Sequence, residues 1–459
     1  MSFTPDRAAI RFGCGLSPTR AAPGSVDDML GALSGPDQAA TDFPIPGMDP
    51  VYANLLAERD ARRAYRKAKT EEDREAASKT LTQTRRSLRI EAAGWFGQTL
   101  LRRAQTPDGF RERLVAFWTD HFTAQGKVQS LILSQANYAE EAIRPHVTGR
   151  FADMLRATTT HPLMLHYLDQ ISSIGPNSRA GKRNPDRGLN ENLAREVLEL
   201  HTLGVGGPYT QDDVRAFANL LTGMGFDYKR GFAFRKAASE PGEHAILDGR
   251  YDGGGGLDAI HAALDDLATH PATARHIAGK LAVHFVGDNP DPALVEALET
   301  RFNDTQGDLL AVCEALLTHP AAWTHQPGNV KQPVDFIGSS LRALDVQPRQ
   351  MPMKRLGRMR RFFYDPLTLM GQTWGQPTGP DGWPEADEDW ITPARLAARL
   401  QWAMFTPLRL RRTLPDPRDF VDVALGDLAP EEVRFAANAA ETRPEGVGIV
   451  LSSVAFQRM

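Results

Sequence analysis

The sequence predicts a mainly α-helical fold: a multi-helix globular array with a long charged helical hairpin, at most a minor β-hairpin, and a long loop rich in Trp, Gly and Pro. Apolar residues recur at helical spacing from Phe110 to Ala322, as in amphipathic helices. Residues 59–89 carry many opposite charges and contain neither Pro nor Gly. Only the segment FDYKRGFAFRKAA, residues 226–238, has the pattern of a short β-hairpin.

The chain has 459 residues and a formal net charge of -4, with acidic and basic residues interleaved. A chain of this length is expected to form about two or three packing units. The small net charge creates no field that would attract nucleic acid, so we expect no nucleic-acid binding. Cys14 and Cys313 are the only cysteines. They are too few for a disulfide framework or a thiolate metal cluster.

The sequence also gives an expectation about location. It has no run of about 18 apolar residues, so we expect no membrane span. Its first residues, MSFTPDRAAIRFGCG, lack the basic and apolar regions of a signal peptide. We therefore expect a cytoplasmic location by default. Export together with a partner that carries its own signal stays open.

Composition divides the chain into four predicted segments, which are residues 1–50, 51–105, 106–345 and 346–459. The first is rich in Gly, Pro and Asp and is expected to wrap the surface. The second is expected to form the charged hairpin, with ion pairs at three- and four-residue spacing. A solvated hairpin is the simpler interpretation, and a partner-binding arm is the alternative.

The third segment is the predicted central helical core. Thr210 and Asp213 within it have the spacing of a capping box at a helix N-terminus. The fourth segment holds the Trp-rich loop GQTWGQPTGPDGWPEADEDWI and the C-terminal helices. Three tryptophans within 17 residues favour an ordered loop, because their buried area would hold it in place.

The segment NENLAREVLELHTLG, residues 190–204, predicts a helix whose polar face carries Asn192, Arg195, Glu196 and Glu199. One interpretation is an ordinary surface helix in which Arg195 pairs with Glu199. In the other, the two glutamates line a cleft. There their pKa values could divide acid and base roles, or their oxygens could bind a divalent metal of unknown identity.

The segment FRERLVAFWTDHF places His121 on the inward stripe of a helix. His121 either forms a hydrogen bond within the core or meets the two glutamates as a metal ligand or general base. His201 lies among leucines, so the Glu-x-x-Glu-x-His string is not a one-face metal motif. The predicted catalytic residues are Glu196, Glu199, His121 and Arg195.

Two other segments carry weaker signals. His276, Lys280 and His284 are spaced four apart, and a lysine there could balance the charge of a carboxylate helix, although an ordinary half-exposed helix has the same spacing. Asp381-Gly382 predicts a turn, so the Trp-rich loop could close as a lid whose tryptophans stack on a sugar or nucleobase. The alternative is a loop anchored to the core by its own aromatics. The predicted substrate-binding residues are Asn190, Asn192, Tyr209, Trp383 and Trp390.

The sequence resembles domain of unknown function family 1800, a group of bacterial proteins. The resemblance covers AIRFGCGLSPT, FWTDHF, NENLAREVLELHTLG with the following Tyr-Thr-Gln, LMGQTWGQPTGPDGWP and WITPARLAARL. It implies a helical fold. Genes of this family often lie beside those of domain of unknown function family 1501, whose members resemble sulfatases or phosphatases with twin-arginine export signals. The resemblance therefore also implies a partner of family 1501 and a paired or exported role.

Two functions follow from these patterns. The first is a hydrolytic or metal-assisted enzyme with a carboxylate-lined cleft, acting on a glycan or another envelope polymer. The second is a non-catalytic partner or escort of an exported family 1501 protein. The sequence contains no Walker loop, Gly-x-Ser-x-Gly elbow or His-Glu-x-x-His motif, which disfavours common nucleotide enzymes and serine hydrolases. Glutamates in a pocket would favour the enzyme, and solvated glutamates the escort.

Overall fold

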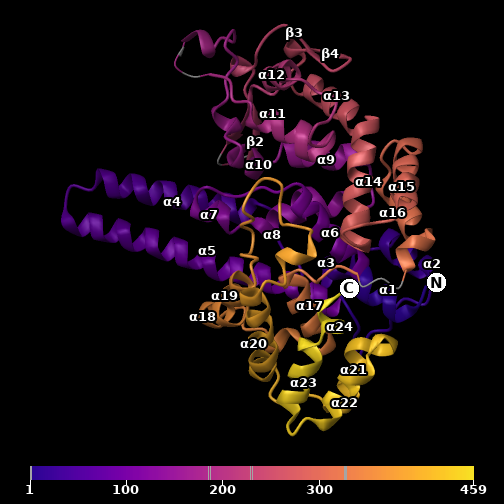
Figure 1. The fold of residues 1–459 in the computed structure, drawn as a ribbon. Helices are drawn as coiled ribbons and strands as arrows, with labels where there is room; N and C mark the ends of the chain where they lie inside the picture. Colours follow the sequence, from indigo (N-terminus) through magenta and orange to yellow (C-terminus); the bar gives the residue numbers. More distant parts are fainter. Residues whose placement is uncertain (1–2, 184–185, 187, 228, 230, 325–327) are drawn as a thin grey trace.

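A computed structural model describes residues 3–183, 186, 188–227, 229, 231–324 and 328–459. Its many helices and two small two-stranded sheets confirm the predicted mainly α-helical fold. Figure 1 shows a body of packed helices from which one helical pair extends as a long arm. Within the described ranges, no helix combines the length and the apolar composition that a bilayer crossing requires.

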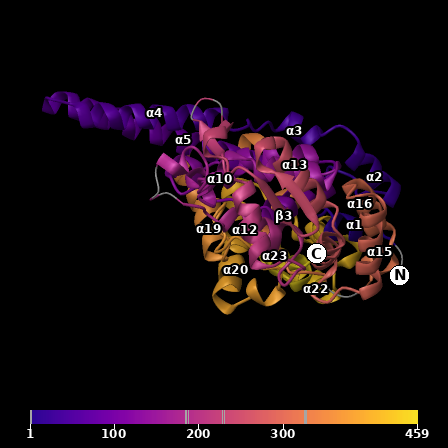
Figure 2. The ribbon, with the colours of Figure 1, turned by 90° about the horizontal axis from the view of Figure 1, so that it is seen from above.

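Three short helices precede the arm: α1 (Pro5–Arg11), α2 (Val26–Ser34) and α3 (Gln38–Asp42). The arm consists of α4 (Asp49–Lys67) and α5 (Glu71–Gln105), which confirms the predicted charged hairpin. Tyr52, Leu55 and Leu88 are buried near its base. Glu58 is also buried there and accepts a hydrogen bond of 2.6 Å from the Ser130 hydroxyl. The far end of the arm projects well beyond the body (Figure 2).

The central part of the chain is helical, apart from two hairpins. Its helices are α6 (Gly109–His121), α7 (Gln129–Ile132), α8 (Gln135–Tyr138), α9 (Phe151–Thr159), α10 (Pro162–Tyr167), α11 (Asn192–Glu196), α12 (Gln211–Leu220), α13 (Leu257–Ala268), α14 (Pro271–Val286), α15 (Pro292–Asp304) and α16 (Leu309–Thr318). π-Helical turns follow α8 and α11, over Ala139–Ile143 and Val197–Thr202. The predicted capping box of Thr210 and Asp213 is present at the start of α12.

The predicted β-hairpin is formed by β1 (Met224–Asp227) and β2 (Gly231–Phe234), and residues 228 and 230 of its turn lie outside the described residues. A second hairpin, β3 (Glu243–Ile246) with β4 (Gly249–Asp252), was not predicted. Each of its strands has four residues. Such a short strand shows too few alternations to be recognised from the sequence.

The C-terminal part begins at α17 (Pro333–Ala343). It continues with α18 (Leu356–Met359), a π-helical turn over Arg360–Tyr364, α19 (Asp365–Leu369), α20 (Pro393–Leu410), α21 (Pro417–Leu425), α22 (Glu431–Ala439), α23 (Arg443–Ser452) and α24 (Val454–Gln457). The Trp-rich loop connects α19 to α20. In Figure 1 it is the orange segment that rises from the C-terminal helices across the centre of the molecule.

The buried apolar residues form two core clusters, and α5 contributes to both. Its residues Leu88 and Trp95 belong to the cluster of the N-terminal and central helices. Phe96 and Leu100 belong to the cluster of the C-terminal helices. Trp374 of the Trp-rich loop packs against both clusters. Because the two core clusters share a helix and a loop, they do not test the predicted four-segment division. That division stays a prediction.

Three His-Pro pairs account for three of the histidines. At His161, His270 and His319, the ring Nδ1 accepts a hydrogen bond from the backbone N–H two residues later, at 3.1, 3.0 and 3.2 Å. Each ring thereby satisfies one of the free donors at the start of a helical segment. These histidines serve as caps and are not candidates for catalysis.

Candidate functional site

The predicted polar helix contains a change of helix type. It is α-helical over Asn192–Glu196 and π-helical over Val197–Thr202. The wider π turn shifts Glu199 relative to the face that a uniform α-helix would give it. Glu196 and Glu199 are both half-buried. π-Helical turns inside helices are frequent at functional sites.

The Trp-rich loop reaches this helix through Asp381. Burial, the charge of Glu199 and the charge of Asp381 together raise the pKa of Glu196 to about 7, against the opposing effect of Arg195. Burial, Glu196 and Asp381 also raise the pKa of Tyr167. Two acidic segments that are far apart in the sequence therefore share one electrostatic environment.

Arg195 forms a different ion pair from the predicted one. Its guanidinium lies 3.4 Å from Glu191 and donates a hydrogen bond of 2.8 Å to the Gln211 side chain. Glu199 interacts instead with Tyr209. Burial and then Glu199, through its charge and a side-chain hydrogen bond, raise the pKa of the Tyr209 hydroxyl. Tyr209 therefore lies beside the predicted carboxylates.

The two predicted asparagines organise the entry to α11. The Asn190 amide donates to the Leu168 carbonyl at 3.1 Å, and its oxygen accepts the backbone N–H of Asn192 at 2.9 Å. The Asn192 side chain is exposed. These contacts give Asn190 a role in local structure, and substrate binding by either residue stays a prediction.

His121 lies in a cluster of histidines. Its Nε2 is 3.2 Å from the His201 carbonyl, and its ring centre is 6.1 Å from that of His201 and 6.0 Å from that of His276. Burial, Lys280 and the two other histidines lower the pKa of His121 well below its ordinary value. Of the two alternatives for His121, this placement corresponds to the hydrogen bond within the core. In the described part of the chain, no three His, Cys, Asp or Glu side chains are placed to bind a metal ion.

Asp120, which the sequence reasoning missed, has the most perturbed carboxyl of this region. The backbone N–H of Trp383 donates to both of its oxygens, at 2.9 and 3.1 Å. Burial raises the pKa of Asp120 to about 8, assisted by Glu385 and Asp381 and opposed by the Trp383 N–H and Lys280. The only signal in the sequence was its position next to His121 in FWTDHF.

The turn of the Trp-rich loop fits closely against Asp120. Gly382 has a φ of 87°, and a Cβ at this position would lie 2.8 Å from the Asp120 carboxyl group. Only glycine combines this backbone conformation with such a close approach. The predicted Asp381-Gly382 turn thus places Asp381 where its charge acts on both Asp120 and Glu196.

Glu385 anchors the same loop to the core. It accepts a hydrogen bond of 2.9 Å from the His284 Nδ1, while the His284 Nε2 lies 2.9 Å from the Arg113 guanidinium. Because arginine can only donate, the Nε2 accepts and the Nδ1 carries the proton. Burial opposes the charge on Glu385, but His284, Lys280 and Arg113 outweigh it and lower the pKa of Glu385. With Nε2 occupied by Arg113, His284 is a positioning residue.

The two predicted tryptophans have different surroundings. Trp390 is 1% exposed, and its indole N–H donates to the Pro384 carbonyl at 3.0 Å. Trp383 is half-buried, with its ring centre 6.2 Å from that of Trp390. Trp390 is therefore an internal anchor of the loop, whereas Trp383 is accessible beside Asp120.

A pocket with about 830 Å³ of empty volume, part of it open to solvent, lies between α5, α6, α8 and the Trp-rich loop. Asp120, Trp374 and Trp383 are among its lining residues, and the four residues of the predicted polar face are not. Among the described residues, Glu196 therefore does not line this pocket.

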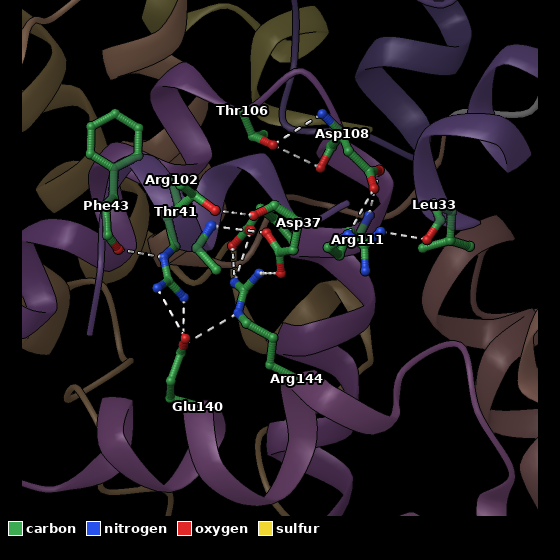
Figure 3. Close-up of polar contacts among 12 residues, drawn as sticks. Leu33, Asp37, Thr41, Phe43, Arg102, Thr106, Asp108, Arg111, Glu140 and Arg144 are labelled. Atoms are coloured by element: carbon green, nitrogen blue, oxygen red, sulfur yellow. Dashed lines mark hydrogen bonds and ion pairs between the residues drawn. The ribbon is translucent and has the colours of Figure 1, made fainter. Parts of the chain in front are cut away.

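The charged groups around this pocket are paired with one another. Arg102 lies 2.6 Å from Glu140, and Arg144 lies 2.7 Å from both Glu112 and Asp37. Figure 3 shows Arg144 between Glu140 and Asp37, with Arg102 on the other side of Glu140. These arginines are almost fully buried. Their charges are satisfied inside the protein.

The comparison with protein families gives one match. The family model described as "Protein of unknown function (DUF1800)" matches residues 7–458, which confirms the resemblance found in the sequence. No curated protein and no solved structure matches the chain.

Proposed function

Because this chain belongs to the DUF1800 family, whose description states no activity, we propose its function from the site: a hydrolase in which Asp120, on the wall of the pocket, transfers the proton. The observation that carries the proposal is the Asp120 carboxyl on the wall of the pocket, with its pKa raised to about 8 by burial. Carboxyl groups with pKa values near the working pH are suited to general acid and base catalysis.

The two groups receive different roles. At neutral pH, Asp120 is mostly protonated and acts as the general acid beside the pocket. Glu196 is about half ionised and, because it does not line the pocket, transfers no proton to a ligand bound there. Glu199 and Arg195 tune Glu196 in opposite directions, because the first raises its pKa and the second lowers it. His121 supports the helix packing from the core side. Asp381 couples the two carboxyls, since its charge raises both pKa values.

The test uses a panel of chromogenic glycosides, esters and phosphates. We expect Asp120→Asn to reduce turnover of the active substrate at least about 100-fold. Asp381→Asn removes a negative charge that raises the pKa of Asp120, so the alkaline limb of the pH–rate profile should move to lower pH. Glu388→Gln, an exposed residue of the same loop, is the matched control. Full activity in Asp120→Asn, or an unmoved profile in Asp381→Asn, would contradict the proposal.

The arm favours a second candidate function, the escort of an exported family 1501 protein. It extends away from the body (Figure 2). From Arg59 to Lys69 it carries six basic side chains and one acidic side chain. Such a surface would suit an acidic partner. This candidate is compatible with hydrolysis, because the pocket is lined by the C-terminal part of α5, at the opposite end of that helix from the arm tip.

A further inference from the structure

The pocket beside Asp120 offers an unusual combination of charge and polarity. The arginines on its wall are neutralised by carboxylates, as in the pairs Arg102–Glu140 and Arg144–Glu112. Asp120 is itself mostly uncharged at neutral pH, since burial raises its pKa to about 8. A charged ligand would therefore lose hydration without meeting an unpaired opposite charge, which is costly.

The hydroxyl groups of the pocket act as acceptors. The hydroxyls of Thr99, Thr119 and Thr123 each donate to a carbonyl of their own helical segment, at 3.2, 2.6 and 2.7 Å. Their protons are committed, and only their lone pairs can face a ligand. A ligand that satisfies them must bring hydrogen-bond donors, as hydroxyl groups do.

The pocket also offers a donor to a ligand. The Gln332 amide oxygen accepts from Gln372, which leaves its NH₂ group for another acceptor. A ligand oxygen would satisfy this NH₂ group, and a donor removed from water gains by being paired.

Two tryptophans complete the pocket. Trp374 packs against Phe96 with ring centres 4.5 Å apart, so its position is fixed by the C-terminal core. The backbone N–H of Trp383 donates a hydrogen bond to the Asp120 carboxyl, which holds Trp383 in place. Both line the pocket and supply flat apolar walls. Ligand pockets commonly combine such walls with a few convergent polar groups.

We propose that this pocket binds an uncharged, hydroxyl-rich ring, the chemistry of a neutral sugar. The inference rests on the proposed function, because it names the substrate class of the same site. Mixed donors and acceptors, paired charges and two aromatic walls all match a sugar that carries several hydroxyls. The Asp120 carboxyl would then lie beside the bound ring, where an acid can protonate a glycosidic oxygen as that bond breaks and water supplies the hydroxyl of the new end.

Calorimetric titration tests the proposal with cellotriose, maltotriose and N,N′,N″-triacetylchitotriose as neutral probes. Trigalacturonate and chitosan trimer serve as the charged probes, and adenosine as a ring of another class. We expect at least one neutral trisaccharide to bind, and the charged trimers to bind at least about tenfold more weakly. Ala139→Leu, which fills the pocket, should weaken binding at least about tenfold, whereas Ala76→Leu on the exposed arm should not. Gln332→Ala provides a milder second variant with the same expected direction.

Asp120→Asn separates this inference from the proposed function. It should abolish hydrolysis and leave sugar binding within about threefold, because the substitution keeps the pocket shape. Failure of all neutral trisaccharides to bind, equal binding of charged trimers or preferential binding of adenosine would overturn the inference. In each case, the proposed function would still hold if the protein showed a pH-dependent activity on another substrate class and that activity required Asp120.

Discussion

At the scale of single residues, Asp120 is the most informative group. Folding moves it from solvent to the underside of the Trp-rich loop and raises its pKa from an ordinary 3.8 to about 8. The folded protein therefore binds more protons than the unfolded chain between these pH values. Stability linked to Asp120 must fall as the pH rises through this window.

Asp120→Asn removes this pH dependence and keeps an acceptor for the Trp383 N–H. Between about pH 5 and pH 8.5, we expect the free energy of unfolding of the variant to rise by about 2 kcal/mol relative to that of the wild type. This is less than full conversion of the pKa shift would give, because the carboxyl group is half-buried. Urea unfolding at the two pH values measures the difference. Asp248→Asn, at an exposed position, should show no such trend. An equal trend in both variants would mean that Asp120 ionises normally.

The histidines show why residue type alone was ambiguous. His161, His270 and His319 cap helical segments, and His121 and His201 lie in the core. His201 was correctly separated from the carboxylates by its place among leucines. The His-Pro caps were not recognised, because the same dipeptide occurs in loops.

At the scale of elements, the arm was the clearest prediction. Dense charge without Pro or Gly is a local property, and it produced the expected pair α4 and α5. The polar helix was predicted less completely. Its change to a π-helix at Val197 depends on packing, since nothing in the local spacing distinguishes it from a regular α-helix.

The arm also allows a test of the escort function. Arg63 and Arg66 are exposed near its tip. We expect Arg63→Glu together with Arg66→Glu to abolish co-purification with a co-expressed family 1501 protein, because the reversed charges would repel an acidic partner. The stability of the variant should stay within about 0.5 kcal/mol of the wild type.

Lys236→Glu, an exposed reversal on the body, is the control for this experiment. Partner capture that survives the double reversal would exclude the arm as the binding surface. Loss of hydrolysis in the same variant would show that the arm tip and the pocket, which lie at opposite ends of α5, are not independent.

At the scale of the whole molecule, two cores are joined by one long helix and one loop. α5 buries Trp95 in the first cluster and Phe96 in the second, and Trp374 touches both. The pocket lies along this junction. Its shape therefore depends on how the two clusters are held together, and not on either cluster alone.

Trp374→Ala tests the junction. Loss of a large aromatic side chain from a packed site costs about 3 kcal/mol. We expect a lower melting temperature and a broader calorimetric transition, because the two clusters would unfold less cooperatively. Phe435→Ala, at a position that is 76% exposed, should leave the transition unchanged. A uniform shift without broadening would show that α5 alone couples the clusters.

The sequence by itself determined the helical fold, the charged arm, the capping box at Thr210, the hairpin of β1 and β2, and the family. Each of these depends on residues close together in the chain, where spacing and capping chemistry act locally. It also identified Glu196 and the Trp-rich loop as candidate parts of a site, but it did not show that Asp381 of the loop acts on Glu196.

Only the tertiary structure decided the candidate site. Asp120, Glu196 and Asp381 come from three separate segments, and their pKa values depend on burial and on one another's charge. The pairing of Arg102 and Arg144 with carboxylates from other elements likewise made the pocket neutral. Burial and long-range contacts are properties of the packed chain, so no local pattern could have given them.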